Sequence, residues 1–387
     1  MRNAEGENKT RLLYKPIVHI LLIVATGLIA YSNTFNVPFQ FDDYTYIIDN
    51  HKLRNLSNFW PPTGSRWTGL LTFALNYKFG GLSVTDYHIV NIIIHIINAL
   101  LVYRLVLLTF KTPFLRKDSG RGVKGQRDKV AEEQDSLSTV NGQQSTNLIA
   151  LFSSLLFISH PVQTQAVTYI VQRFTSLATM FYLLSLVLFV KWRLKAEQQS
   201  NSTAEQQVNK TILAQLRGRT SAPLLYCAGL LSAVLAMKTK EIAFTLPIII
   251  VLYEFFFFSK SQNSEPSGSM QNPPIPPLTK GGKGGFLRIT RHVSRFLYLL
   301  PFFLTLIIIP LNFIGYDWEI YKPVPDAEEK LRQLQLKDLA ALSKYEYLQT
   351  QFRVIVTYIR LLFLPVNQNL DYDYPIYNSF LNPNVFL

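Results

Sequence analysis

Long apolar runs recur along the chain, and a polar or basic stretch separates each run from the next. The runs lie at about 17–31, 88–110, 148–159, 174–192, 222–237, 242–258 and 296–314. A helix needs about 20 mainly apolar residues to cross the hydrocarbon of a bilayer. The pattern therefore predicts an all-α polytopic membrane protein with about seven transmembrane helices. A shorter run at 351–365 lies between polar residues and is predicted to be a short interfacial or re-entrant helix.

The composition agrees with membrane insertion. Of 387 residues, 48% are hydrophobic and 16% are charged, whereas about a quarter of the residues in ordinary soluble domains are charged. The formal charge of +13 falls in the connections between apolar runs, and a nucleic-acid binder would carry it on a folded polar face. Nucleic acid is therefore not an expected partner.

The distribution of Lys and Arg predicts the orientation. Segments 1–16, 111–146, 193–221 and 259–295 are rich in these residues, whereas 32–86 is long and carries few of them. Cytoplasmic loops retain positive charge, so we expect residues 1–16 to be cytoplasmic. The protein is expected in the cell inner (plasma) membrane, with its active site on the extracytoplasmic side. Segment 32–86 then forms a large helical extracytoplasmic first loop. The Gln, Ser, Gly and Pro content of the three internal basic connections predicts disordered cytoplasmic loops.

Two adjacent carboxylates, Asp42 and Asp43, lie in the first outer loop within FQFDDYTYIIDN. Neighbouring carboxylates can serve as a general base and its partner, because proximity and partial burial tune their ionisation. The alternative is an ordinary loop turn or a helix N-cap, where Asp is favoured.

Basic residues near the outer ends of the expected spans are candidates for binding an anion. Arg66 stands beside Trp67 and could bind a phosphate in a bidentate way. Alternatively, the two side chains could be an interfacial anchor. The outer turn KTKE contains Lys238, Lys240 and Glu241. Lysines at an outer boundary depart from the positive-inside trend, which favours a lipid phosphate as ligand; extension of the lysines to the headgroups is the alternative.

The second span opens with His88, Asn91 and His95, which share one helical face. They could line a substrate cavity or form hydrogen bonds between helices. A metal site is the least favoured of the three interpretations, because no further ligand follows at a recognised spacing.

Two further segments concentrate polar side chains near the outer surface. The connection HPVQTQAVTYIVQR holds His160, Gln163 and Arg173, although a surface helix with one apolar side would also fit. Asp371 and Asp373 alternate with tyrosines in NLDYDYP, a combination that suits carbohydrate binding and also an ordinary membrane rim.

The order of these motifs resembles a known family. The acidic pair, Arg66 with FALNY, YHxxNxxxH, HPxQTQAVxYIxQR, KTKE, and LLFLP with DYDYP are similar to the transmembrane and tetratricopeptide-repeat-containing proteins and their bacterial relatives, which are protein O-mannosyltransferase-like. The resemblance covers about residue 17 to the end, so 17–387 is expected to form a membrane glycosyltransferase-like domain.

The resemblance implies inverting transfer of a sugar from a polyprenyl-phosphate-linked donor to a hydroxyl acceptor, a protein Ser or Thr or a glycan, at the outer membrane face among membrane lipids. It implies that Asp42 accepts the acceptor's proton and that Asp43 orients the acceptor or the sugar. Four basic side chains are implied as ligands of the departing phosphate: Arg66, Arg173, Lys238 and Lys240. The motifs assign no certain cofactor, and a divalent cation held by Asp42 and Asp43 with the donor phosphate is left open.

The chain also departs from the family. Trp67 stands where relatives often have Pro, and no repeat of about 34 residues is visible. Because the chain ends at NPNVFL, we expect a truncated product in which the enzyme could be inactive. The alternative functions are a transporter or flippase of a lipid-linked sugar and an inactive membrane scaffold.

Overall fold

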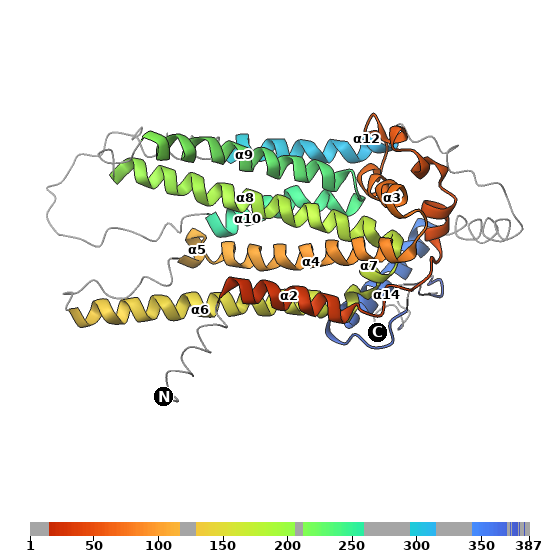
Figure 1. Cartoon of the computed structure of the whole chain (residues 1–387), viewed down its shortest axis with the longest axis horizontal. Coiled ribbons are helices and arrows are strands. Elements are labelled where there is room, and N and C mark those ends of the chain that lie inside the picture. Colours follow the sequence, from red (N-terminus) through yellow and green to blue (C-terminus); the bar gives the residue numbers. More distant parts are fainter. Residues whose placement is uncertain are drawn as a thin grey trace, which may run out of the picture.

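The computed structural model describes residues 15–116, 129–205, 212–258, 295–314 and 343–369, together with residues 372, 374–377, 379 and 383. Within these residues the regular structure is helical and no strand occurs, which confirms the predicted all-α fold. Helices α2 (Pro16–Ala30), α4 (Val84–Thr109), α6 (Lys129–Ser159), α8 (Arg173–Glu205) and α9 (Ile212–Met237) run side by side along the long axis of the molecule (Figure 1).

Helix α4 lies at the centre of the bundle. It packs against α6 on one side and α8 on the other; α9 covers α8, and α2 covers both α4 and α6. Gly27 allows α2 to approach closely, since a methyl group at this position would lie 2.6 Å from the Ile158 side chain and 2.9 Å from that of Ile96. Small residues commonly permit such approaches between membrane helices.

Three helices in the described part of the chain are long and apolar enough to cross a membrane: Val84–Thr109, Ile170–Gln198 and Glu241–Phe258. The last contains α10 (Leu246–Phe258). A fourth crossing is counted if Gly142–Ser159 and Pro161–Thr168, which meet at an angle of 50°, are one broken span. The shorter apolar helices are Pro16–Ala30, Ala222–Met237 and Arg295–Leu311, the last ending within α12 (Ile308–Ile314). The count of seven spans stays a prediction.

The basic connections are more helical than their composition predicted. Helix α6 begins at Lys129, α8 continues to Glu205 and α9 begins at Ile212, so helix covers parts of 111–146 and 193–221. A further short helix, α5, spans Pro113–Arg116. Lys, Ala, Glu and Gln are good helix formers, which explains why these polar stretches extend the apolar helices. Residues 259–294 lie outside the described ranges.

The first loop is built from short helices and has its own apolar core. A π-helical turn, Tyr44–Ile48, precedes two 3-10 turns, His51–Arg54 and Leu56–Phe59, and then α3, Trp67–Gly80. Its buried apolar side chains pack with Tyr87 of α4 and with the residues around the start of α8 in one cluster: Ile47, Leu53, Phe59, Leu70, Phe73, Ala74, Tyr87, Ile170, Val171 and Phe174. The loop is therefore folded onto one end of the bundle (Figure 1).

The run at 351–365 belongs to α14, Lys344–Phe363, which begins with a capping box between Ser343 and Glu346. Gln349 and Thr357 are buried on its protein side. Its exposed side carries large apolar residues: Phe352, Ile355, Ile359, Leu362 and Phe363. Leu361 is also buried and Arg360 is also exposed, so the outward side mixes large apolar residues with a basic one, which suits the interfacial location predicted for this run.

Candidate functional site

The acidic pair lies at the end of the bundle that the first loop covers. The Asp43 side chain is 1% exposed. Its Oδ1 accepts a hydrogen bond from the backbone N–H of Val171 at 2.7 Å, and its Oδ2 accepts one from the backbone N–H of Gln40 at 3.0 Å. Asp42 is half-buried, and its backbone N–H donates to the Tyr169 hydroxyl at 2.9 Å. Asp43 therefore joins the loop to the segment before α8, and Asp42 is the more accessible carboxylate.

Burial dominates the ionisation of Asp43. Loss of solvation raises the pKa of its carboxyl to about 6, although the two backbone N–H groups and the charge of Arg173 act in the opposite direction. The charge of Asp42 raises the pKa further. Asp43 is thus poised to change protonation state in mildly acidic solution.

A pocket of about 180 Å³ opens beside Asp43. It lies between the first loop, the turn and short helix that precede α8, and the segment after α14. No lysine or arginine of the described part of the chain lines it; the described lining is Val37, Pro38, Gln40, Asp43, Thr164, Gln165, Thr168, Tyr169, Gln368 and Asn369. Amides, hydroxyls and an aromatic ring beside the Asp43 carboxyl suit a neutral ligand with many hydroxyl groups better than an anionic ligand.

Arg66 and Glu241 meet near this end of the bundle, where Arg66 Nε lies 3.7 Å from Glu241 Oε1. Arg66 also donates from Nη1 to the Tyr46 hydroxyl at 2.8 Å, and its guanidinium lies 5.4 Å from the Phe174 ring centroid. The Arg66 backbone is left-handed, with a φ of 59°. Such conformations in non-glycine residues are costly and often occur at functional sites. The Arg66 side chain is 28% exposed and that of Glu241 is 40% exposed, so a ligand can reach both.

Lys240 lies next to this pair. Its Nζ donates to the Thr175 hydroxyl at 2.7 Å and to Gln172 Oε1 at 3.4 Å. Burial, followed by the positive charge of Arg66, lowers the pKa of Lys240, which Glu241 partly offsets. Burial also lowers the pKa of Lys238. An anionic ligand beside Lys240 and Arg66 would stabilise the charged form of the lysine, because it would reduce the repulsion between the two positive charges.

The turn that carries these lysines is fixed to the first loop. The backbone N–H of Thr68 donates to the Lys238 carbonyl at 3.1 Å, and the Thr68 hydroxyl donates to the Leu235 carbonyl at 3.4 Å. Helix α3 therefore holds Arg66 and the KTKE turn in one assembly.

Arg173 is fully buried, which places it apart from this exposed basic group. It donates to the side-chain oxygens of Asn91 and Asn76, both at 2.6 Å, and to the carbonyls of Tyr87 at 2.9 Å and Thr72 at 3.4 Å. Its guanidinium also faces the Phe73 ring at 4.4 Å. These contacts join α3, α4 and α8, so the geometry favours a role in positioning over direct contact with phosphate.

The polar face of α4 is used between helices. His88 Nε2 lies 2.9 Å from the Val37 carbonyl, and His95 Nε2 lies 3.2 Å from the Ile158 carbonyl. The Asn91 amide donates to the carbonyls of Val167 and Ile170. Of the two favoured interpretations, hydrogen bonding between helices is the one that the described contacts support, because none of the three α4 residues lines the pocket.

The other predicted residues of the outer connections do not belong to the acidic and basic groups described above. His160 starts the bend after α6: its Nδ1 accepts from the backbone N–H of Val162, and its Nε2 lies 3.0 Å from the Leu362 carbonyl of α14. Gln163 is half-buried in the turn Pro161–Gln163. Asp371 and Asp373 lie outside the described residues. Within the described part of the chain, no cluster of three or more His, Cys, Asp or Glu side chains is arranged to hold a metal ion.

Several site residues could not be identified from their own sequence signal. Gln172 and Thr175 are three apart at the start of α8, and Thr175 donates to Gln172 at 2.6 Å while both contact Lys240. This i, i+3 spacing of polar residues at the head of an apolar helix was the available clue. Tyr169 was not among the predicted site residues, yet its hydroxyl accepts a hydrogen bond from the Asp42 backbone N–H and the residue lines the pocket.

The known proteins that resemble this chain include several protein O-mannosyl-transferases. No family model matches the chain, and no solved structure matches it. The protein O-mannosyl-transferase Tmtc3 of Drosophila melanogaster is 28% identical over 66% of this chain and 26% of its own length. The protein O-mannosyl-transferase tmtc2 of Xenopus laevis is 28% identical over 62% of this chain and 24% of its own, and human protein O-mannosyl-transferase TMTC1 is 22% identical over 77% and 35%.

The matched part of the chain spans about a quarter of the length of the first two relatives. All three relatives carry the same activity in their names. The comparisons thereby confirm the resemblance predicted from the order of the motifs: this chain is similar to the protein O-mannosyltransferase-like membrane glycosyltransferases.

Proposed function

We propose that residues 17–387 form the membrane-embedded part of a glycosyltransferase that moves mannose from a polyprenyl-phosphate donor to a protein Ser or Thr hydroxyl. The relatives named as protein O-mannosyl-transferases support this class of reaction. In the proposal the seven apolar helices span the plasma membrane, the N-terminus is cytoplasmic, and the first loop with its site is extracytoplasmic.

The observation that carries the proposal is the convergence of acidic and basic groups on one short segment, residues 169–175. Asp42 contacts Tyr169, and Asp43 contacts Val171. Lys240 contacts Gln172 and Thr175 of the same segment. The backbone of Asp42, the carboxylate of Asp43 and the ammonium of Lys240 thus all contact this segment, which places a candidate base and a candidate phosphate ligand on the same element.

In the proposed reaction, Asp42 removes the proton of the acceptor hydroxyl as its oxygen attacks the anomeric carbon of the sugar. The bond between that carbon and the phosphate oxygen breaks, and the configuration inverts. Arg66 and Lys240, with Lys238 nearby in the same turn, stabilise the negative charge on the departing polyprenyl phosphate. Glu241 keeps Arg66 oriented.

The neutral pocket beside Asp43 is assigned to the sugar. Its amide and hydroxyl side chains can bind sugar hydroxyls, and the Tyr169 ring can stack on a sugar face. Asp43 keeps this wall in place through its two backbone contacts. Arg173, His88, Asn91 and His95 position the elements around the site, and His160 with Gln163 shape the bend below the pocket.

The test is transfer of radiolabelled mannose from polyprenyl-phosphate mannose to a Ser/Thr peptide in membranes that contain the full chain. We expect Asp42→Asn to lower transfer by about 10²- to 10⁴-fold, the usual contribution of a general base. The control is Asp49→Asn, which changes an exposed carboxylate of the same loop. Equal transfer by wild type and Asp42→Asn would remove Asp42 as the base.

The phosphate assignment has a separate test in the same assay. Arg66→Gln and Lys240→Gln should each lower kcat/KM for the donor by about tenfold or more, since each loses a charge-assisted hydrogen bond to the departing phosphate. Translocation of a labelled donor across vesicles without any transfer to peptide would instead favour a flippase and contradict the proposal.

A further inference from the structure

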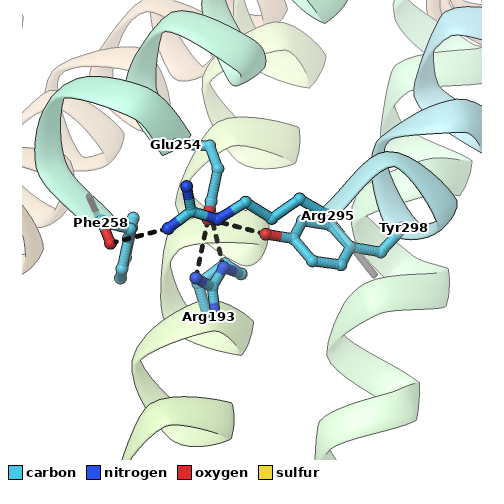
Figure 2. Close-up of polar contacts among 5 residues, drawn as sticks. All are labelled: Arg193, Glu254, Phe258, Arg295 and Tyr298. Atoms are coloured by element: carbon cyan, nitrogen blue, oxygen red, sulfur yellow. Dashed lines mark hydrogen bonds and ion pairs between the residues drawn. The ribbon is translucent and has the colours of Figure 1, made fainter. Parts of the chain in front are cut away.

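A second group of charges lies at the other end of the bundle, away from the first loop. Glu254 of α10 is 0% exposed although it lies in an apolar helix. Arg193 of α8 donates to both of its carboxylate oxygens, at 2.7 and 2.8 Å. Arg295, at the start of the apolar helix Arg295–Leu311, places Nε 3.4 Å from Glu254 Oε1. Figure 2 shows the two guanidinium groups approaching the carboxylate from different sides.

The contacts around this carboxylate are well formed. The Tyr298 hydroxyl donates to Glu254 Oε1 at 2.7 Å, and Arg295 Nη2 donates to the Phe258 carbonyl at 3.3 Å. The guanidinium of Arg193 lies 4.8 Å from the Phe258 ring and 5.3 Å from the Tyr298 ring. The cluster, defined here as Arg193, Glu254, Arg295 and Tyr298, joins α8 and α10 to the helix that starts at Arg295.

The charges of the cluster do not cancel. Two guanidinium groups face one carboxylate, so one positive charge remains within these four residues, while the charge of Glu197 outside them also acts on Arg193. Arg193 binds Glu254 in a bidentate way and neutralises it, whereas Arg295 makes the longer ion pair. The Arg295 side chain is 15% exposed, which lets the surplus charge reach the surface of the bundle.

Among the described residues, large apolar side chains that follow Arg295 or Glu254 in the chain are exposed. Phe255 is 48% exposed, Phe256 67%, Phe296 63% and Leu297 62%. The Arg295 guanidinium lies 6.0 Å from the Phe255 ring. A positive charge at the end of a span, edged by exposed aromatic and aliphatic side chains, matches both parts of a phospholipid: the phosphate for the charge and the acyl chains for the apolar rim.

We propose that the cluster is a binding site for an anionic phospholipid of the adjoining leaflet. The headgroup phosphate binds the exposed edge of Arg295, and the acyl chains lie along Phe255, Phe256, Phe296 and Leu297. The bound lipid neutralises the surplus charge and stabilises the junction of α8, α10 and the Arg295 helix. This site is separate from the sugar-transfer site and does not depend on the function proposed above.

The experiment measures thermal unfolding of the full chain in mild detergent while phosphatidylglycerol or phosphatidylcholine is added. We expect phosphatidylglycerol to raise the Tm at lower concentration than phosphatidylcholine. Arg295→Gln should weaken the apparent affinity for phosphatidylglycerol about fivefold, the usual contribution of one basic side chain at an anionic membrane surface. Arg104→Gln is the matched control, because Arg104 is an exposed arginine of α4 outside the cluster.

A second variant guards against loss of folding in Arg295→Gln. Phe256→Ala removes an exposed side chain and leaves the ion pairs intact, and it should weaken phosphatidylglycerol binding without affecting the Tm in detergent alone. Equal effects of the two lipids, unchanged affinity in both variants, or the same Tm increase with inorganic phosphate would each overturn the proposal.

Discussion

Buried charged groups have different partners at the two ends of the bundle. At the first-loop end, Arg173 is surrounded by neutral oxygens and aromatic rings, and Asp43 is held by backbone N–H groups. At the other end, Arg193 and Glu254 are paired directly. Both arrangements give the charged groups hydrogen-bond partners, but only the second pairs opposite charges directly.

This difference bears on function. A charged group whose hydrogen bonds go to neutral groups is not neutralised by an opposite charge. Its electric field can therefore act on a ligand or on a neighbouring ionisable group. The raised pKa of Asp43 shows that the first-loop end tolerates an ionisable group in a poorly solvated position. The paired end holds helices together and leaves a single surplus charge at its edge. Three changes test this comparison.

Replacement of Arg173 should have the largest effect. Arg173→Met fills similar space but leaves the oxygens of Asn76, Asn91 and Tyr87 without their donor, each at a cost of about 1–3 kcal/mol. Because such costs do not add fully, we expect the free energy of unfolding to fall by about 4–5 kcal/mol in total. Arg193→Met is the comparison variant. Unfolding of the Arg173 variant in detergent at the wild-type temperature would contradict the role of Arg173 in joining the three helices.

Removal of the carboxylate at the opposite end should cost slightly less. Glu254→Ala leaves two guanidinium groups facing each other, and breaking a buried pair costs about 3–5 kcal/mol. Arg193 and Arg295 are each partly exposed, so water relieves part of this cost and places the expected loss near 3 kcal/mol. Thermal unfolding measures the loss, with Asp49→Ala as a control at an exposed carboxylate. A Tm equal to that of the control would show that the cluster contributes little.

The smallest effect is the pH dependence that Asp43 causes. Because its pKa is raised to about 6 in the folded protein, the folded state binds a proton more readily than the unfolded state does. This contribution to stability is present at low pH and is lost as the pH rises through about 6. We expect the stability of wild type relative to Asp43→Asn to fall by about 1–2 kcal/mol between pH 4 and pH 7. Parallel pH profiles of the two proteins would mean that Asp43 does not titrate in this range.

The sequence predicted the main helices because apolar runs show their length and position directly. It did not predict that α6 begins at Lys129 or that α8 reaches Glu205. In these stretches Lys, Ala, Glu and Gln suit both a solvated helix and a disordered segment, so composition could not decide between them.

At the candidate site, the sequence identified the acidic pair and the basic residues but not their partners. The contact of Asp43 with Val171 joins residues 128 positions apart, and local patterns carry no information about such a pairing. The family resemblance implied that Arg173 binds phosphate, whereas its burial depends on α3 and α4. Glu254 was overlooked, although a lone charge within LPIIIVLYEFFFF was itself a signal of a buried partner.

The network of Arg173 also has a consequence for how the protein is made. Thr72, Asn76, Tyr87 and Asn91 all precede Arg173 in the chain, so a ribosome has synthesised every acceptor before this arginine appears. In the membrane location proposed above, every hydrogen-bond acceptor of Arg173 is therefore available when this arginine is inserted. The order of synthesis then avoids an uncompensated guanidinium among lipid chains.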